Sequence, residues 1–231
     1  LNTIGENLEH IYRRQAIPMV YDFPESAIFC DAMGGAYNQI EWIAKYIESE
    51  SISPFSAVCF KTASGDVNQF DAKSIDATVT DPPYYDAMAY ADFSDFYYLW
   101  FRKMLMEELP EILSTPQTPK AEECTAIKHY HNNSIDQAKE HFEKMLTSIF
   151  TAIEYQTKGI VSIMYAHQRT EAWTTLCNSI LSSGMNIDGS WAIDSERSNA
   201  GIKAGKAFLE SSVTVACRPS ERKGFADFDE V

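Results

Sequence analysis

The sequence predicts an α/β fold with a largely parallel sheet. Apolar, β-branched runs at 57–61, 76–80 and 160–167 indicate strands. Helical patterns separate the later runs, and such alternation is typical of parallel sheets. Two more strands are expected around 186–193 and 211–217. No strong helix pattern lies between them, so we expect an antiparallel pair at one end of the sheet.

Four helices are expected from apolar residues that recur at i, i+3 and i+4. The first covers about 37–49, and the second carries an aromatic stripe over 93–105 that we expect to be core. The third follows a capping box made by Ser134 and Gln137. The side chains expected on its buried face are Ala138, Phe142, Met145, Leu146, Ile149 and Ile153.

The fourth helix is expected between a cap at Thr170 and a terminator at Gly184. Its inward residues are expected to be Trp173, Leu176, Cys177, Ile180 and Leu181. Residues 108–133 contain three prolines and many polar residues, which predicts a long loop. A helical insertion is therefore expected over about 85–158 of a single domain, 1–231.

Composition limits the class of protein. The five cysteines lie far apart with no C-x-x-C pair, which argues against a disulfide framework or a zinc site. They are expected to be reduced thiols, mostly buried, of a cytoplasmic protein. No apolar run approaches the roughly 20 residues of a membrane span. The chain begins with Leu1, so we expect a fragment of a longer protein.

The net charge of −14 is unfavourable for a protein that binds nucleic acid. The charge is uneven, however, because the stretch 197–223 holds six basic and two acidic residues. That local excess of +4 is either a phosphate-binding patch or an ordinary solvated surface.

Asp81-Pro82-Pro83-Tyr84 directly follows the strand expected at 76–80, where parallel sheets keep their chemistry. Methylation of an exocyclic amine needs such a set, because the nitrogen lone pair is delocalised into the ring. Asp81 and the Pro82 carbonyl can accept the two N–H bonds and orient the lone pair. Tyr84 can stack on a base that has left its duplex. The alternative is a plain turn, since Asp and Pro are common turn formers.

The run DPPYYDAMAYADFSDFYYLWFRKML (81–105) resembles the catalytic segment of a family of adenine-specific DNA methylases. IYRRQAIPMVYDF (11–23) and SSVTVACRP (211–219) also resemble that family. The resemblance implies a Rossmann-like methyltransferase fold with S-adenosylmethionine as methyl donor. The order of elements corresponds to the second half of such a domain, so its N-terminal half is expected to be incomplete.

The Gly-rich donor motif of that family, D-P-F-x-G-x-G, is not found. Residues 30–36 are the nearest candidate, but a plain loop that enters the first helix explains them as well. The motif is expected upstream of the chain. Gly65-Asp66, 15 residues before Asp81, resembles the site at which such enzymes contact the donor's adenine; a polar turn is the alternative.

Substrate contacts are expected from Tyr85, Asp86, Arg197 and Lys203. No metal site is expected, because the histidines at 129 and 131 have no carboxylate or cysteine at ligand spacing.

The leading hypothesis is N6-adenine methylation of DNA within a longer restriction-modification or defence protein. The same tetrad chemistry serves N4-cytosine, RNA and protein amides. The rival is a non-catalytic methyltransferase fold that acts as a scaffold.

Overall fold

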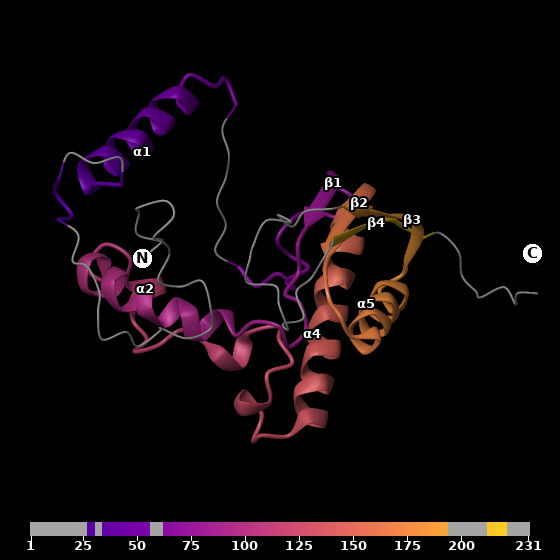
Figure 1. Cartoon of the computed structure of the whole chain (residues 1–231). Coiled ribbons are helices and arrows are strands. Elements are labelled where there is room, and N and C mark those ends of the chain that lie inside the picture. Colours follow the sequence, from indigo (N-terminus) through magenta and orange to yellow (C-terminus); the bar gives the residue numbers. More distant parts are fainter. Residues whose placement is uncertain (1–26, 31–33, 56–61, 194–211, 221–231) are drawn as a thin grey trace, which may run out of the picture. The chain divides into compact units, whose positions relative to one another are not determined.

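The computed structural model describes residues 27–30, 34–55, 62–193 and 212–220 (Figure 1). The expected strand at 57–61 and residues 31–33 of the donor-motif candidate lie outside these ranges. The chain forms two compact units, Leu1–Lys61 and Thr62–Val231. No helix in the described ranges has the length and apolarity needed to cross a membrane.

The first unit contains one described helix, α1 (Ala36–Glu50), which confirms the helix expected over 37–49. None of its residues is buried. Its apolar side chains Ile40, Ile43 and Ile47 share a face and are exposed.

The second unit is built on a four-stranded mixed sheet, which confirms the α/β class. Its strands are β1 (Ile75–Thr80), β2 (Thr157–Tyr165), β3 (Met185–Ile193) and β4 (Ser212–Pro219). Their order is β1-β2-β4-β3. β1 and β2 are parallel, and β4 is antiparallel to both β2 and β3. β3 therefore runs in the same direction as β1 and β2, and the carboxyl ends of these three strands meet at one edge.

Helices α4 (Ile135–Gln156) and α5 (Thr170–Ser182) pack side by side on one face of this sheet (Figure 1). The core between these helices and the sheet contains Phe142, Leu146 and Phe150 of α4 together with Val161, Ile163 and Tyr165 of β2. On the other face, apolar side chains remain exposed, and Val79 reaches 81%. The described residues thus cover one face of the sheet.

Capping places α4 as expected. The Ser134 hydroxyl accepts a hydrogen bond from the Gln137 backbone N–H at 3.3 Å. The Gln137 side chain instead accepts from Asn132 Nδ2 at 3.4 Å. Ala138, Phe142 and Leu146 are fully buried, while Met145, Ile149 and Ile153 are partly buried against the core.

The start of α5 differs from the prediction. Arg169 is its N-cap and makes no side-chain cap, so Thr170 is the first helical residue. Gly184 does terminate the helix, at a left-handed φ of +87° that favours glycine. Leu176 and Ile180 are buried as expected, but Leu181 is exposed because it lies on the far side of the helix.

Helix α2 (Tyr90–Leu105) is present, but the prediction that its aromatic stripe is core is wrong. Its buried residue is Ala91. The stripe residues Phe96, Tyr97, Trp100, Phe101, Met104 and Leu105 are 37–62% exposed. Helical spacing gathers side chains on one face, but it cannot specify that another element covers that face.

The opposite, polar face of α2 is the one that packs, and it orders the segment predicted to be a long loop. Tyr98 donates to the Thr115 carbonyl at 2.8 Å, and Arg102 Nε donates to the Leu113 carbonyl at 3.2 Å. Asp95 accepts from the backbone N–H of Thr118 at 2.9 Å. The segment contains three short helical pieces, α3 (Pro110–Leu113), η1 (Lys120–Glu122) and η2 (Lys128–Tyr130).

Candidate functional site

Asp81-Pro82-Pro83-Tyr84 lies at the carboxyl end of β1, directly after Thr80. Asp81 is exposed, Pro82 is buried, and Pro83 and Tyr84 are half-buried. A tight turn follows, in which the Tyr85 N–H donates to the Pro83 carbonyl at 3.1 Å. Because proline donates no backbone hydrogen bond, the sheet ladder ends here and Asp81 faces solvent.

The turn contains a strained residue. Tyr85 has a φ of +52°, a left-handed conformation that costs an L-residue about 1–2 kcal/mol. Its ring is only 3% exposed and packs edge-on against Phe142 and His167, with centroids 5.1 and 5.8 Å away. Its carbonyl accepts from the Ala126 N–H at 2.9 Å. Strain held by packing in this way is typical of functional turns.

This burial changes the expected role of Tyr85. A side chain enclosed by Phe142 and His167 does not fit the contact with a substrate that the sequence predicts. The ring instead anchors the turn to the core. Burial raises the pKa of Tyr85 above its usual range, so the phenol stays neutral.

Aromatic side chains from β2 and α5 support Tyr84. Its ring meets Tyr165 edge-on at 5.5 Å, and Tyr165 in turn meets Trp173 at 5.1 Å. Tyr165 is fully buried at the carboxyl end of β2, and burial raises its pKa. Its hydroxyl has no hydrogen-bond partner among the described residues. The half-exposed Tyr84 ring is therefore held firmly on one side.

Asp86 joins this turn to the end of β2. His167 Nε2 lies 3.3 Å from one carboxylate oxygen, and Arg169 Nη1 donates to the other at 2.7 Å. The Arg169 backbone N–H donates to His167 Nδ1 at 3.0 Å. The sequence predicts no role at this site for His167 or Arg169. Parallel pairing of β1 and β2, which brings their carboxyl ends together, is the signal that could have found them.

Tyr90 lies close to the tetrad. Burial first, and then the negative charge of Asp81, raise the pKa of the Tyr90 phenol. A phenol of this kind remains a neutral hydroxyl beside the Asp81 carboxylate at neutral pH.

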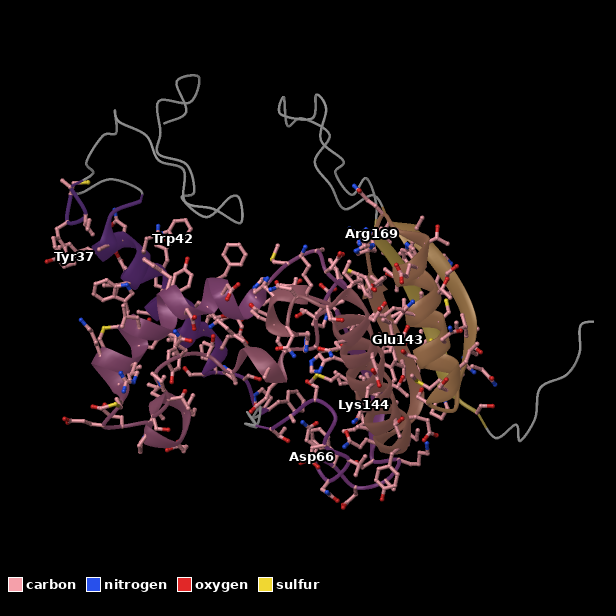
Figure 2. All side chains as sticks on the ribbon, turned by 90° about the horizontal axis from the view of Figure 1, so that it is seen from below. Tyr37, Trp42, Asp66, Glu143, Lys144 and Arg169 are labelled. Atoms are coloured by element: carbon pink, nitrogen blue, oxygen red, sulfur yellow. The ribbon has the colours of Figure 1, made fainter. Side chains whose placement is uncertain are left out.

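The structure does not bring Gly65-Asp66 to this edge. Gln156, the last residue of α4 directly before β2, donates from Nε2 to the Asp66 carbonyl at 3.0 Å. Along the six residues of β1, the amino and carboxyl ends lie about 17 Å apart. Figure 2 places Asp66 and Arg169 at opposite ends of the layer, with Glu143 and Lys144 between them.

Local contacts account for both residues of this turn. The Asp66 carboxylate accepts from the Asn68 N–H at 2.9 Å, and this bond holds its pKa below the usual range. A Cβ on Gly65 would come within 2.9 Å of Ser148 Oγ, which explains a glycine where the turn meets α4. The polar-turn interpretation therefore fits this structure better than contact with a donor.

Arg197 and Lys203 lie outside the described residues. The ends of their loop are described, however, because Ile193 of β3 pairs with Ser212 of β4. Ile193 and Ser212 thus lie at the same end of the strands as the tetrad, on strands that β2 separates from β1.

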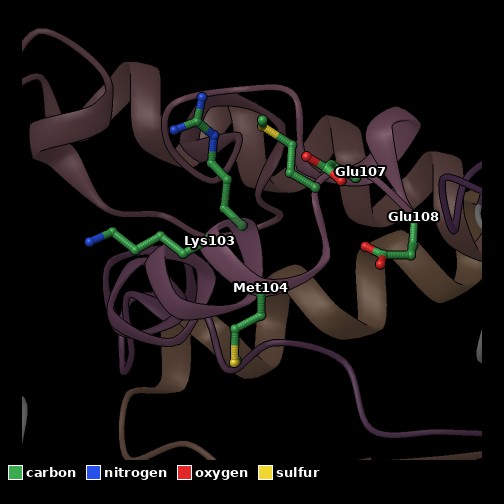
Figure 3. A pocket seen from close by; sticks show the side chains of 6 residues that line it. Lys103, Met104, Glu107 and Glu108 are labelled. Carbon is green, nitrogen blue, oxygen red and sulfur yellow. The ribbon is translucent and has the colours of Figure 1, made fainter.

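Other polar groups form no metal centre in the described ranges. His129 Nε2 lies 3.2 Å from Asp92, and the rings of His131 and His141 lie 4.4 Å apart. A hollow of about 400 Å³ opens at the carboxyl end of α2 (Figure 3). Charged side chains and two methionines line it, far along α2 from the tetrad: Arg102, Lys103, Met104, Met106, Glu107 and Glu108.

Comparisons with known proteins leave the family open. No family model matches the sequence, and no curated protein matches it. A structural similarity exists to a protein from Thermus thermophilus that is named provisionally as a DNA modification methylase. The TM-score is 0.37 at 10% identity, over 72% of this chain and 54% of that protein. The chain thus spans about half the length of that protein.

Proposed function

We propose that this chain is the catalytic part of an amino-methyltransferase that uses S-adenosylmethionine, and that its substrate is the N6 amine of adenine in DNA. One observation carries the proposal. Asp81-Pro82-Pro83-Tyr84 lies at the carboxyl end of a parallel strand, in a turn whose strained geometry is held by packing. Ordinary surface turns do not need a buried, left-handed tyrosine.

The chemistry assigned to Asp81 follows from its exposure. Asp81 presents a solvent-facing carboxylate that can accept one N–H bond of an amine. The Pro82 carbonyl accepts the second in this proposal. Two acceptors on one nitrogen draw it towards tetrahedral geometry and fix the direction of its lone pair. Such positioning contributes several kcal/mol to rate.

The assignment of a nucleobase rests on Tyr84. Its ring is braced edge-on by Tyr165 and keeps part of its surface open. Stacking of a base on such a ring contributes about 1–3 kcal/mol. The base must leave the duplex to reach it. In this proposal Arg197 and Lys203, whose loop starts at the same edge, contact the phosphates.

The sheet also supports a methyltransferase fold. The resemblance implies the second half of a Rossmann-like domain. The observed second unit has the expected parallel strands, crossover helices and final antiparallel pair at one end of the sheet.

Among the described residues of the second unit, no predicted donor contact lies beside the tetrad. Gly65-Asp66 lies at the opposite end of the strands from Asp81. When bound, the donor would supply an electrophilic methyl group. The proposal assigns donor binding to residues outside the described ranges.

That same observation favours a second candidate function, a methyltransferase fold without activity that binds other molecules. The net charge of −14 also favours it, since phosphate repels an acidic surface. The two candidates differ in whether Asp81 is needed for a covalent product.

The test is transfer of a labelled methyl group from S-adenosylmethionine to unmethylated DNA, with RNA and protein as parallel acceptors. Asp81→Ala is compared with Asp76→Ala, which removes an exposed carboxylate from the start of the same strand. We expect label in DNA adenine, its loss by at least about a hundredfold in Asp81→Ala, and no loss in Asp76→Ala.

Each other result has a defined meaning. Label in cytosine, RNA or protein would keep the reaction type and reject adenine. No label in any acceptor, with no heat of donor binding in calorimetry, would replace the enzyme by the binding module.

A further inference from the structure

We propose that Asp86 is a positioning residue which, with His167 and Arg169, fixes the shape of the turn that carries Asp81 to Tyr84. The inference rests on the proposed function, because it concerns the geometry of the same site. It replaces the expectation from sequence that Asp86 contacts the substrate.

Both carboxylate oxygens of Asp86 are already engaged. One lies 3.3 Å from His167 Nε2 and the other accepts from Arg169 Nη1 at 2.7 Å. The Asp86 side chain is 26% exposed and that of His167 only 7%. These two donors, which follow β2 in the chain, fix the orientation of the carboxylate and occupy about half of its acceptor sites.

The hydrogen bonds also determine the tautomer of His167. Its Nδ1 accepts from the Arg169 backbone N–H, so Nδ1 carries no proton. In the neutral ring the proton is then on Nε2, which donates it to Asp86. The Trp173 indole N–H donates to the His167 carbonyl at 2.8 Å, which fixes the backbone at the same place.

This network acts on the strained residue. Tyr85 lies between Tyr84 and Asp86, and its left-handed backbone relaxes unless both sides are held. The Ala126 N–H and the buried ring hold Tyr85 itself. Asp86 holds the residue that follows. The pairing of β1 with β2 ends at Thr80 and Ile163, so Asp86 provides a side-chain link between these strands beyond their ladder.

The experiment uses the full chain and four variants. Asp86→Asn removes the charge, and Arg169→Ala removes one donor at a side chain that is 61% exposed, so it leaves the core intact. Arg169→Lys keeps the cation. Asp76→Asn is the matched control, because it breaks the Asp76–Lys158 ion pair between the same two strands at their other end.

Four quantities are measured. Amide hydrogen exchange reports the turn at 84–87, and nitrogen NMR reports the tautomer of His167. Single-turnover methyl transfer and DNA affinity separate the rate from binding.

We expect Asp86→Asn and Arg169→Ala to speed exchange at 84–87 about tenfold, because the turn opens locally. Asp86→Asn should also lower the population of the His167 tautomer that carries its proton on Nε2. We expect transfer to slow about a hundredfold, since a displacement near 1 Å has such an effect, with DNA affinity unchanged. Arg169→Lys should restore most of the rate, and Asp76→Asn should change nothing.

Unchanged exchange at 84–87 would overturn the inference, and so would an unchanged transfer rate in an active enzyme. If the unmodified chain transfers no methyl group to any acceptor, the proposed function fails separately. Exchange and the His167 tautomer then decide the inference alone: a change in Asp86→Asn supports it, and no change rejects it.

Discussion

Glu123 connects the amino end of α2 to the segment that precedes α4. One of its carboxylate oxygens accepts from the Ala91 N–H at 3.2 Å, and the other is buried with no partner among the described residues. Burial is the main cause that raises the pKa of Glu123 above its usual range. The Glu123 side chain therefore stabilises the fold as a hydrogen-bond acceptor, but its negative charge is destabilising where it is buried.

Glu123→Gln tests this balance. In the folded protein Glu123 holds its proton to higher pH than in the unfolded chain, so its contribution to stability is present below the unfolded pKa, near 4.5. That contribution is lost as pH rises through the folded pKa. The glutamine keeps an oxygen for Ala91 and carries no charge. We expect a higher free energy of unfolding at pH 7 and a smaller fall between pH 4 and 7, measured by urea denaturation.

The control for this change is Glu41→Gln on α1. That carboxylate is exposed and paired with Lys45, which lowers its pKa. Its replacement should neither raise the free energy of unfolding at pH 7 nor reduce the fall of that free energy between pH 4 and 7, the two effects expected for Glu123→Gln. Equal stability of Glu123→Gln and the unmodified protein at pH 7 would show that burial does not disfavour the charge.

At the level of elements, α2 and α4 both have amphipathic sequences but differ in burial. Phe142, Leu146 and Phe150 of α4 are fully buried between β2 and α5. The aromatic stripe of α2 is exposed, and its polar face holds the segment 110–123 instead.

We therefore expect Trp100→Ala and Leu146→Ala to differ in stability. Removal of the exposed Trp100 ring should change the free energy of unfolding by about 0.5 kcal/mol or less. Removal of the buried Leu146 side chain should cost about 2–5 kcal/mol. Urea denaturation measures both. A cost of several kcal/mol at Trp100 would mean that another part of the protein covers this face.

The same contrast shows what could be predicted from sequence. The strands from residue 75 onward, the Ser134 cap and the Gly184 end depend on local pattern and backbone preference, and the structure confirms them. The partner of a helix face depends on distant residues, so the predicted buried side of α2 is wrong. At the site, the place of Asp81 follows from the strand before it. His167 and Arg169 could not be found without the pairing of β1 with β2, some 80 residues apart along the chain.

For the whole molecule, the question is how a chain of net charge −14 would bind DNA. Described cations near the tetrad are already paired with carboxylates: Arg169 with Asp86, Lys120 with Asp95, and Lys139 with Glu171. Phosphate contacts are therefore expected from the basic stretch 197–223, which follows β3 at the same end of the strands as the tetrad.

The double variant Arg197→Glu/Lys203→Glu tests this expectation. Loss of two phosphate contacts should weaken DNA binding and reduce the slope of log affinity against log salt by about 2. Fluorescence anisotropy with a short unmethylated duplex at several salt concentrations measures both. The control Lys73→Glu/Lys158→Glu makes the same change of net charge near the amino ends of β1 and β2, where these lysines pair with Glu154 and Asp76. Equal weakening by the two pairs would show that DNA responds only to net charge. An unchanged slope in the Arg197/Lys203 double variant would mean that these two residues do not contact phosphate. The acidic net charge would then favour the binding module.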